Sequence, residues 1–376
     1  MSETLSPSKA TGSNDVPRST SAMTKEWLTA VLCKDVPGAR VLDFQTTGGS
    51  RGTSTRQGLQ LLLNENARQA GLPSRLFTKC SKHFNQRLML GFSGMIDGEI
   101  GFYSQIRPQL TIEAPIGYHA CVDRDSWRSM VLLEDVAATR GARFISTETR
   151  VTREQMKDLL ANMARWHGHF CNSPQLRHEL KWLRRPADFL HAITPLGFHF
   201  LAALGMRRAS AVIPQAVRAG SSQLWTALAL SFQLNQQGPQ TLLHGDPHIG
   251  QTYITDAGKM GYADWQLVMQ GGWAFDVVYA MVSALSVEDR RQWERELLRY
   301  YLDQLHAAGG PRVSFDDAWL QYRQNTIYPY FCWLMTLTGV FLPLMPKMQT
   351  EKVSLDIIAR SASAIGDLES LRAVGS

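Results

Sequence analysis

The spacing of hydrophobic residues changes about a third of the way along the chain of 376 residues. Before that point, apolar residues occur in short runs bounded by Gly, Ser or Asn, which is typical of strands. The runs lie at residues 39–46, 58–63, 75–80, 118–122 and 129–134. After a loop at 91–95, the residues Ile96, Ile100, Tyr103, Ile106 and Leu110 recur at helical spacing. This part is therefore predicted to be a five-stranded sheet with one internal helix.

Helical spacing dominates the remainder of the chain. We predict helices at 152–170, within 186–236, at 286–308 and at 315–341. Three short strand-like runs, at 240–243, 252–255 and 260–263, interrupt this pattern. Strands followed by helices predict an α+β protein. We expect an N-lobe at 24–134 and a C-lobe at 135–376, joined by a polar linker near 134–139.

Two segments lie outside this simple pattern. Residues 1–23 are rich in Ser, Thr and Pro and lack an apolar run, which predicts a disordered leader rather than a signal peptide. Residues 324–346 carry no charge and are long enough to span a membrane. However, Pro329, Pro343 and Pro346 interrupt the segment, so we predict a buried helix and no membrane span.

Composition narrows the functional classes. The formal charge of +6 suits phosphate-bearing ligands, but no dense Lys/Arg stripe interleaved with aromatic residues indicates nucleic-acid binding. The five cysteines are odd in number, scattered and free of any CxxC pair. This argues against a disulfide framework and a structural zinc site, and it favours the reducing cytoplasm.

The segment that carries chemistry is His244-Gly-Asp-Pro-His248, followed by Gly-Tyr-Ala-Asp-Trp-Gln at 261–266. Phosphate transfer requires a carboxylate that aligns the attacking hydroxyl and oxygen ligands for magnesium. Asp246, in a tight loop, can supply the first. Asp264 ends a short strand 18 residues later, so a hairpin can return it to the site as a magnesium ligand. Gln251 could add a neutral oxygen.

This pattern, with Gly-Trp-Ala-Phe-Asp at 272–276, resembles the aminoglycoside phosphotransferase and choline kinase superfamily, including its ecdysteroid-kinase-like branch. The resemblance extends more weakly over roughly residues 25–345. It implies a protein-kinase-like two-lobed fold and a kinase that uses ATP and Mg²⁺ to phosphorylate a small-molecule alcohol. It further implies that Asp246 is the catalytic carboxylate and Asp264 the metal ligand. The implied supports of the loop are His244, His248 and Asp276.

The resemblance also assigns residues in the N-lobe. Lys79, in the third strand-like run, would bind the α- and β-phosphates, with Glu99 as its ion-pair partner. The hinge at 133–136 would bind adenine through its backbone, at Glu134 and Val136. The glycine-containing loop at 48–55 would cover the phosphates, with Gly49, Ser50, Gly52 and Thr53 as binding residues.

One departure from the family pattern keeps alternatives open. Gln251 stands where the family has a metal-binding Asn, and its extra methylene requires a shifted metal, an adjusted backbone or a bridging water. A catalytically weak nucleotide-binding or scaffold protein of kinase fold is therefore the first alternative. A second is a metal-dependent hydrolase that uses His244, Asp246 and His248. Its further ligands would be His167 and His169, but these point to different faces of a helix and are interpreted as packing or surface residues.

The acceptor is limited by the charges of residues 186–236. This segment holds one acid, Asp188, against three arginines and two histidines at Arg207, Arg208, Arg218, His191 and His199. A polycationic aminoglycoside would require carboxylates around it. We therefore predict a neutral or acidic, partly apolar alcohol. A protein substrate is disfavoured, because only a short segment separates Asp264 from Gly272.

Overall fold

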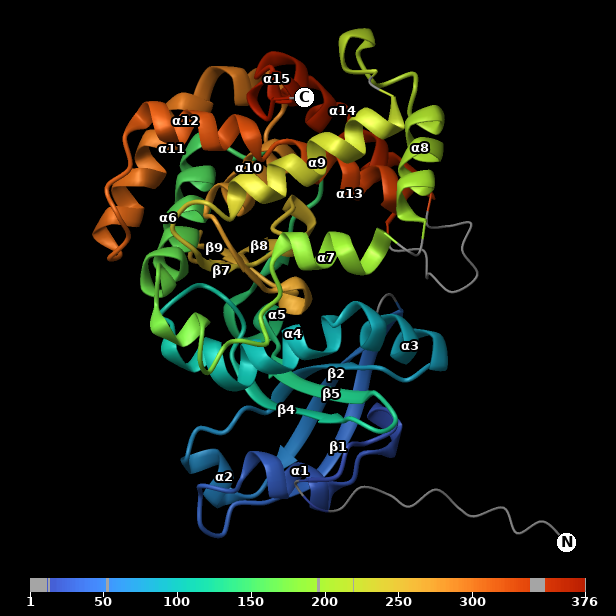
Figure 1. Cartoon of the computed structure of the whole chain (residues 1–376). Helices are drawn as coiled ribbons and strands as arrows, with labels where there is room; N and C mark the ends of the chain where they lie inside the picture. Colours follow the sequence, from blue (N-terminus) through green and yellow to red (C-terminus); the bar gives the residue numbers. More distant parts are fainter. Residues whose placement is uncertain are drawn as a thin grey trace, which may run out of the picture. The chain divides into compact units, whose positions relative to one another are not determined.

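The computed structural model describes residue 12 and residues 14–51, 54–194, 197–218, 220–338 and 349–375. The chain forms two compact units (Figure 1). Unit 1 comprises Met1–Gln109 and Pro115–Gly141, and unit 2 comprises Leu110–Ala114 and Ala142–Ser376. Each unit has its own hydrophobic interior, and each is described separately below.

Unit 1 contains an antiparallel five-stranded sheet in the order β1-β2-β3-β5-β4. All five strand-like runs of the sequence are confirmed as strands. The segment predicted as a loop between the first two is shorter than expected, because β1 and β2 continue as a paired hairpin to Arg51 and from Thr55. The strands are β1 (Val41–Arg51), β2 (Thr55–Leu63), β3 (Arg75–Cys80), β4 (Gly117–Asp123) and β5 (Arg128–Glu134).

One face of this sheet packs on α1 (Lys25–Leu32), whose N-cap Thr24 accepts a hydrogen bond from the Trp27 N–H through its side chain. In β2, Leu59, Leu61 and Leu63 are buried while the residues between them are exposed, as expected for a strand with one solvated face. The predicted disordered leader is too long. Thr20, in a 3-10 turn at Thr20–Ala22, is fully buried, and it belongs with Met23 to the packed part of unit 1.

The helical part of unit 1 is richer than the single helix predicted. A short helix, α2 (Glu65–Gln69), follows β2, and two helices, α3 (Phe84–Ser93) and α4 (Met95–Gly101), follow β3. The chain continues as a π-helical turn at Phe102–Ile106 and a 3-10 turn at Arg107–Gln109.

The loop predicted at 91–95 is wrong. Only Gly94, with a left-handed φ of 71°, separates α3 from α4. Gly91 suggested a loop, but it serves close packing, because a Cβ there would lie 2.5 Å from the ring of Trp127. The polar linker predicted near 134–139 is also helical, as α5 (Val136–Arg140), and its N-terminus is capped by the Asp135 side chain.

Unit 2 holds two small sheets. The first has the order β6-β8-β9, and the second pairs β7 with β10. The three predicted runs are confirmed as β7 (Thr241–Leu243), β8 (Thr252–Ile254) and β9 (Met260–Tyr262). The other two strands, β6 (Arg143–Phe144) and β10 (Met269–Gly271), were not predicted, and the two residues of β6 are too few to establish a hydrophobic period.

Helices surround these strands in Figure 1, and α10 (Ala274–Ala284) lies innermost, with every residue buried. It contacts five other helices of the unit. The predicted helix at 315–341 is two helices separated at Asn325, and residues 339–341 lie outside the described chain. The other helices are α6 (Arg153–Phe170), α7 (Pro186–Ile193), α8 (Phe198–Arg208), α9 (Ser221–Asn235), α11 (Val287–Ala307), α12 (Phe315–Gln324), α13 (Ile327–Thr338), α14 (Glu351–Asp367) and α15 (Ser370–Ala373).

The apolar segment at 324–346 provides α13, which is buried as predicted. Pro343 and Pro346 lie outside the described residues. Within the described part of the chain, none of the helices is both long and apolar enough to cross a membrane. Short 3-10 turns complete the unit, at Pro174–Leu176, Gln215–Val217, Ile249–Gln251 and Trp265–Leu267.

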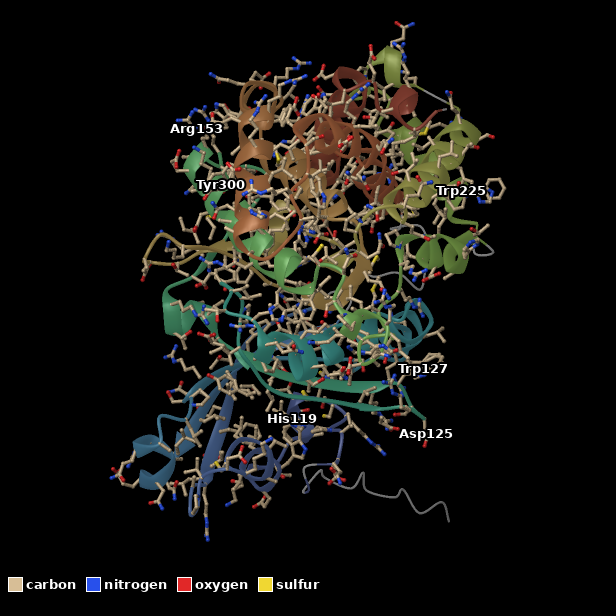
Figure 2. All side chains as sticks on the ribbon, turned by 60° about the vertical axis from the view of Figure 1, so that its left-hand side comes forward. His119, Asp125, Trp127, Arg153, Trp225 and Tyr300 are labelled. Carbon is tan, nitrogen blue, oxygen red and sulfur yellow. The ribbon has the colours of Figure 1, made fainter. Side chains whose placement is uncertain are left out.

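Polar contacts join the outer helices. On the flank formed by α6 and α11, Arg153 pairs with Glu296 at 3.2 Å and the Lys157 Nζ lies 5.7 Å from the centre of the Tyr300 ring (Figure 2). Such exposed pairs each contribute a fraction of a kcal/mol to about 1 kcal/mol. The packing of α6 on α11 therefore depends mainly on the apolar residues beneath them.

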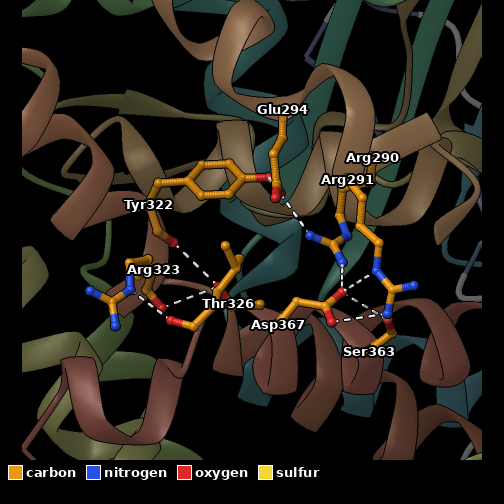
Figure 3. Close-up of polar contacts among 9 residues, drawn as sticks. Arg290, Arg291, Glu294, Tyr322, Arg323, Thr326, Ser363 and Asp367 are labelled. Atoms are coloured by element: carbon orange, nitrogen blue, oxygen red, sulfur yellow. Dashed lines mark hydrogen bonds and ion pairs between the residues drawn. The ribbon is translucent and has the colours of Figure 1, made fainter. Parts of the chain in front are cut away.

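A more buried ion cluster ties α11 to α12 and α14 (Figure 3). Arg290, only 1% exposed, donates to Glu294 at 2.8 Å and to Asp367. Arg291 also binds Asp367, and the Tyr322 hydroxyl donates to Glu294 at 3.4 Å. Burial raises the pKa of Glu294. Removing one member would leave a buried charge unpaired, so the cluster anchors α14 on the unit.

Candidate active site

The loop after β7 is held by the Asp276 carboxylate of α10. Its Oδ2 accepts a hydrogen bond from the His244 N–H at 2.6 Å, and its Oδ1 accepts one from the Gly245 N–H at 3.0 Å. Asp276 is fully buried, and it stands in the first turn of α10, where a negative charge is favoured by the helix dipole. The structure thus brings the predicted support Asp276 to the backbone of the predicted loop.

Gly245 is required by the path of this loop. Its φ is 81°, a left-handed value that glycine adopts without strain. A Cβ at this position would lie 1.9 Å from the Leu267 carbonyl oxygen, so any side chain would force two loops apart. The loop that carries Asp246 therefore packs directly on the segment that follows Asp264.

The His244 side chain joins the same two loops. Its Nε2 lies 3.0 Å from the Ala263 carbonyl oxygen, and its Nδ1 lies 3.3 Å from the Asp246 backbone N. A carbonyl oxygen only accepts and an N–H only donates, so both contacts fit a neutral ring protonated at Nε2. His244 is buried and holds the backbones of Asp246 and Ala263 together.

Asp246 itself sits in a half-buried position with its side chain 19% exposed. The side chains of Tyr279 and Gln251 lie close enough to favour its charged form, and Asp264 is near enough to repel its charge. Burial, reinforced by the charge of Asp264, raises the pKa of Asp246 to about 7 despite Tyr279 and Gln251. A carboxyl group whose pKa lies near neutrality suits proton transfer at physiological pH.

Asp264 follows β9 in an unusual conformation, with φ 61° and ψ 65°. Aspartate tolerates the left-handed region better than most residues, although the cost is of the order of 1 kcal/mol. A hydrogen bond from the Ala263 N–H to the Gln251 carbonyl, at 2.8 Å, ties this turn to the loop of Asp246. The predicted hairpin therefore does return Asp264 to the neighbourhood of Asp246 and Gln251.

The transition-metal alternative finds little support in this geometry. Both ring nitrogens of His244 are already engaged. The His248 Nδ1 accepts from the Gly250 N–H at 3.1 Å, so this ring nitrogen is engaged as well. Within the described chain, no three His, Cys, Asp or Glu side chains gather as metal ligands.

Two residues of the site were not predicted from the sequence. His167, interpreted as a packing or surface residue, is buried, with its Nε2 at 3.3 Å from the Asp276 Oδ2 and its Nδ1 at 2.7 Å from the Tyr301 hydroxyl. Tyr279 lies beside Asp246, and its hydroxyl accepts from the Trp333 Nε1 at 2.8 Å. The sequence could have indicated Tyr279 by its spacing, because Tyr279 is three residues after Asp276 and therefore faces the same side of α10. His169, as expected, points elsewhere and is exposed.

In unit 1, Lys79 of β3 and Glu99 of α4 form an ion pair at 2.5 Å, with side chains only 6% and 7% exposed. The two residues predicted to pair are thus in contact. A buried pair of this kind persists only with good geometry, because both charges leave water. Gly49 and Ser50 lie exposed at the end of β1, and Gly52 and Thr53 lie outside the described residues.

The structure shows which backbone groups of the predicted hinge are already engaged. The Glu134 N–H is already bonded to the Ile116 carbonyl at 2.8 Å, so it is not available to a base. The Glu134 carboxylate is buried and bound by Thr139 and Arg140, whose guanidinium lies 2.6 Å away. Val136 opens α5, where first-turn N–H groups have no partner within the helix. Of the two hinge residues, Val136 therefore offers the backbone donor.

The raised pKa of Asp246 has a measurable effect on stability. The pKa of Asp246 is about 7 in the folded protein, above the ordinary value of 3.8, so folding takes up a proton between these pH values. The free energy of unfolding therefore falls as the pH rises from about 4 through 7. Asp246→Asn carries no charge, so without metal it will be more stable than the wild type at pH 8, on the order of 2–4 kcal/mol. The gain will shrink at pH 5.

Thermal melting in EDTA at the two pH values measures this difference. Asp256→Asn, at an exposed position of the β8–β9 hairpin, is the matched control. Its melting temperature should differ from that of the wild type by the same small amount at both pH values. Equal melting temperatures of Asp246→Asn and wild type at pH 8 would contradict the expectation.

Comparison with known proteins places this geometry in context. The model of the phosphotransferase enzyme family, APH, matches residues 93–315. No curated protein matches the sequence significantly. The structure is similar to that of a candidate aminoglycoside phosphotransferase from Ralstonia eutropha, with a TM-score of 0.52, 11% identity, and coverage of 92% of this chain and 97% of that chain.

A second similar structure is that of LicA, the choline kinase of Streptococcus pneumoniae, in complex with AMP. The TM-score is 0.50 at 13% identity, over 92% of this chain and 97% of that chain. At such low identity these similarities concern the fold alone. They confirm the predicted α+β, protein-kinase-like fold class.

Proposed function

Because the chain belongs to the phosphotransferase enzyme family and is a small-molecule kinase, we propose that it transfers the γ-phosphate of ATP to a neutral or acidic, partly apolar alcohol with the help of Mg²⁺. The observation that carries this proposal is the grouping of Asp246, Asp264 and Gln251, on two loops that His244 and Asp276 hold together. Scaffolding alone does not require a half-buried carboxyl group with a raised pKa.

In the proposed mechanism, Asp246 orients the acceptor hydroxyl and takes its proton as the phosphate is transferred. Its pKa of about 7 makes it a stronger base than an ordinary carboxylate. The Tyr279 hydroxyl, which accepts a hydrogen bond from Trp333, lies near the Asp246 carboxylate and would help to orient it. Tyr279 is thus a positioning residue, since it acts through Asp246.

Mg²⁺ would be held by Asp264 and Gln251, with further oxygens from the nucleotide. The donor set fits, because Mg²⁺ prefers carboxylate and amide oxygens. The Gln251 side chain lies near Asp246, and its amide oxygen would be the atom that binds the cation. When bound, the ion would neutralise charge on the phosphates.

The nucleotide would be bound by unit 1. We propose that Lys79, fixed by Glu99, binds the α- and β-phosphates. The hinge would bind adenine through the Glu134 carbonyl and the Val136 N–H. The hairpin residues Gly49, Ser50, Gly52 and Thr53 would cover the phosphates. All five cysteines are free thiols, which supports a reducing compartment such as the cytoplasm.

The acceptor class follows from charge. Asp188, the single acid of residues 186–236, caps α7 by accepting from the Arg185 N–H at 2.9 Å, so it is already engaged. Arg207 and Arg218 are exposed in the same segment. A tri- or tetracationic aminoglycoside would meet positive charge there, whereas a neutral or anionic alcohol would not.

A coupled assay of ADP release will test the function. With ATP and Mg²⁺, we expect turnover with members of a library of apolar alcohols and hydroxy acids, and background rates with kanamycin and streptomycin. EDTA should abolish the turnover. Turnover with the aminoglycosides alone would refute the acceptor class. Nucleotide binding without transfer to any compound would favour the scaffold alternative.

A further inference from the structure

The turn that carries Gln251 is attached to α10 by a serine. This 3-10 turn, Ile249–Gln251, begins with the Ile249 N–H, which donates to the Ser283 Oγ at 3.1 Å. Ser283 stands in the last turn of α10 and is fully buried. Its hydroxyl donates to the Ala280 carbonyl at 3.3 Å, so an oxygen lone pair remains for the turn. The helix that holds the start of the catalytic loop by its first turn therefore holds the end of the loop by its last turn.

The position of Ser283 is itself fixed by α14. The last carbonyls of a helix have no partner within that helix. Arg360 of α14 donates to the carbonyls of Ser283, at 2.7 Å, and Ala284, at 3.4 Å. A further bond joins Arg360 to the Thr147 carbonyl at 2.8 Å. A cation is also favoured at a helix C-terminus by the helix dipole. The last turn of α10 therefore cannot shift without breaking these bonds.

The other backbone groups around Gln251 are bonded as well. The Gln251 N–H donates to the His248 carbonyl, and the Gln251 carbonyl accepts from the Ala263 N–H, both at 2.8 Å. The Ile249 carbonyl accepts from the Thr252 hydroxyl at 2.7 Å. The backbone of Gln251 is therefore fixed, and only its side chain is free to adjust. A shorter asparagine at this position could not recover the missing methylene by a movement of the backbone.

We propose that Ser283 is a positioning residue for the metal site, because it fixes the turn at the place from which glutamine, and not asparagine, reaches the ion. This inference rests on the proposed function, in which Gln251 binds Mg²⁺. Groups that orient a metal ligand without touching the metal change its affinity by roughly 10–100-fold. Ser283 should therefore affect the binding of metal and leave the binding of nucleotide alone unchanged.

Titration of Mn²⁺ into the ADP-bound protein, followed by electron paramagnetic resonance, measures the metal affinity without any turnover. In Ser283→Ala we expect the dissociation constant for Mn²⁺ to rise about 10-fold, the lower end of that range. The dissociation constant for ADP without metal should stay the same. Ser231→Ala is the matched control, because Ser231 is also buried and donates to a backbone carbonyl, that of Gln324, at 2.6 Å. It should bind Mn²⁺ as the wild type does.

Gln251→Asn gives a second test that does not depend on how well Ser283→Ala folds. With the turn fixed, asparagine should weaken Mn²⁺ binding about 10-fold. In the Ser283→Ala background it should weaken binding by less than about 3-fold further, because the backbone can then move and the two effects are coupled.

The inference is overturned, and the proposed function stands, if Ser283→Ala binds Mn²⁺ like Ser231→Ala. The same holds if Gln251→Asn binds Mn²⁺ as tightly as the wild type, or if the two substitutions act independently. A wild type that binds no Mn²⁺ would overturn the proposed function together with the inference.

Discussion

Asp246→Ala will lower the rate constant of phosphate transfer by about 10²–10⁴-fold, the range expected when a general base is removed. The Michaelis constant for ATP will change little, because Asp246 contacts the acceptor in the proposed mechanism and the nucleotide is bound by other residues. Neither Tyr279 nor Gln251 can substitute for it. Tyr279 is a donor with a strongly raised pKa, and the Gln251 amide cannot accept a proton at neutral pH.

The control is Asp256→Ala, which removes an exposed carboxylate from the hairpin that leads to Asp264. Its rate should stay within about twofold of the wild type. Since the Asp246 variants are expected to be at least as stable as the wild type, their loss of turnover cannot be ascribed to unfolding. Full activity of Asp246→Ala would refute the assignment of the base, whereas turnover absent in every protein would refute the function itself.

Asp276→Asn will destabilise unit 2 by about 2–4 kcal/mol, the cost of leaving buried hydrogen-bonding groups unsatisfied. Asp276 accepts from two backbone N–H groups and contacts His167, and it is fully buried. In asparagine one of the two oxygens becomes an NH₂ group, which would face the N–H of His244 or Gly245. For a unit of this size the melting temperature should fall by about 4–12 °C.

Activity will fall as well, because the loop of Asp246 loses its anchor. The assay should be run far below the melting temperature of the variant, so that the folded protein is measured. Asp303→Asn, on the exposed side of α11, is the matched control and should melt within 1–2 °C of the wild type, the usual range for surface substitutions. A melting temperature of Asp276→Asn equal to that of the control would contradict the role given to these hydrogen bonds.

Much of the fold was predictable because alternation and helical periodicity are local signals. All five strands of unit 1 and the helix α6 follow from them. The errors arose where one residue type has two uses. Gly91 packs against Trp127 inside a helix and does not mark a loop, and Asp135 starts a helix where a polar linker was expected.

The site was predictable to the extent that it lies on contiguous motifs. Spacing within the chain and the family resemblance predicted the loop of Asp246 and the return of Asp264 to it. The resemblance also predicted the pair of Lys79 with Glu99. His167 could not be assigned, because its contact with Asp276 joins residues 109 positions apart. Membership of the phosphotransferase family is confirmed. The ecdysteroid-kinase-like branch, the metal ligands and the acceptor stay predictions.

The complete burial of α10 affects how the protein loses activity. Amide protons on an element without surface residues exchange with solvent only when the surrounding structure unfolds as a whole. Asp276 and Tyr279 stand on this helix, where Asp276 binds the backbone of the loop and Tyr279 lies beside the carboxylate of Asp246. Local fraying therefore cannot release the catalytic loop from its support. Heat inactivation should coincide with cooperative melting of unit 2, without an earlier step in which the site loosens.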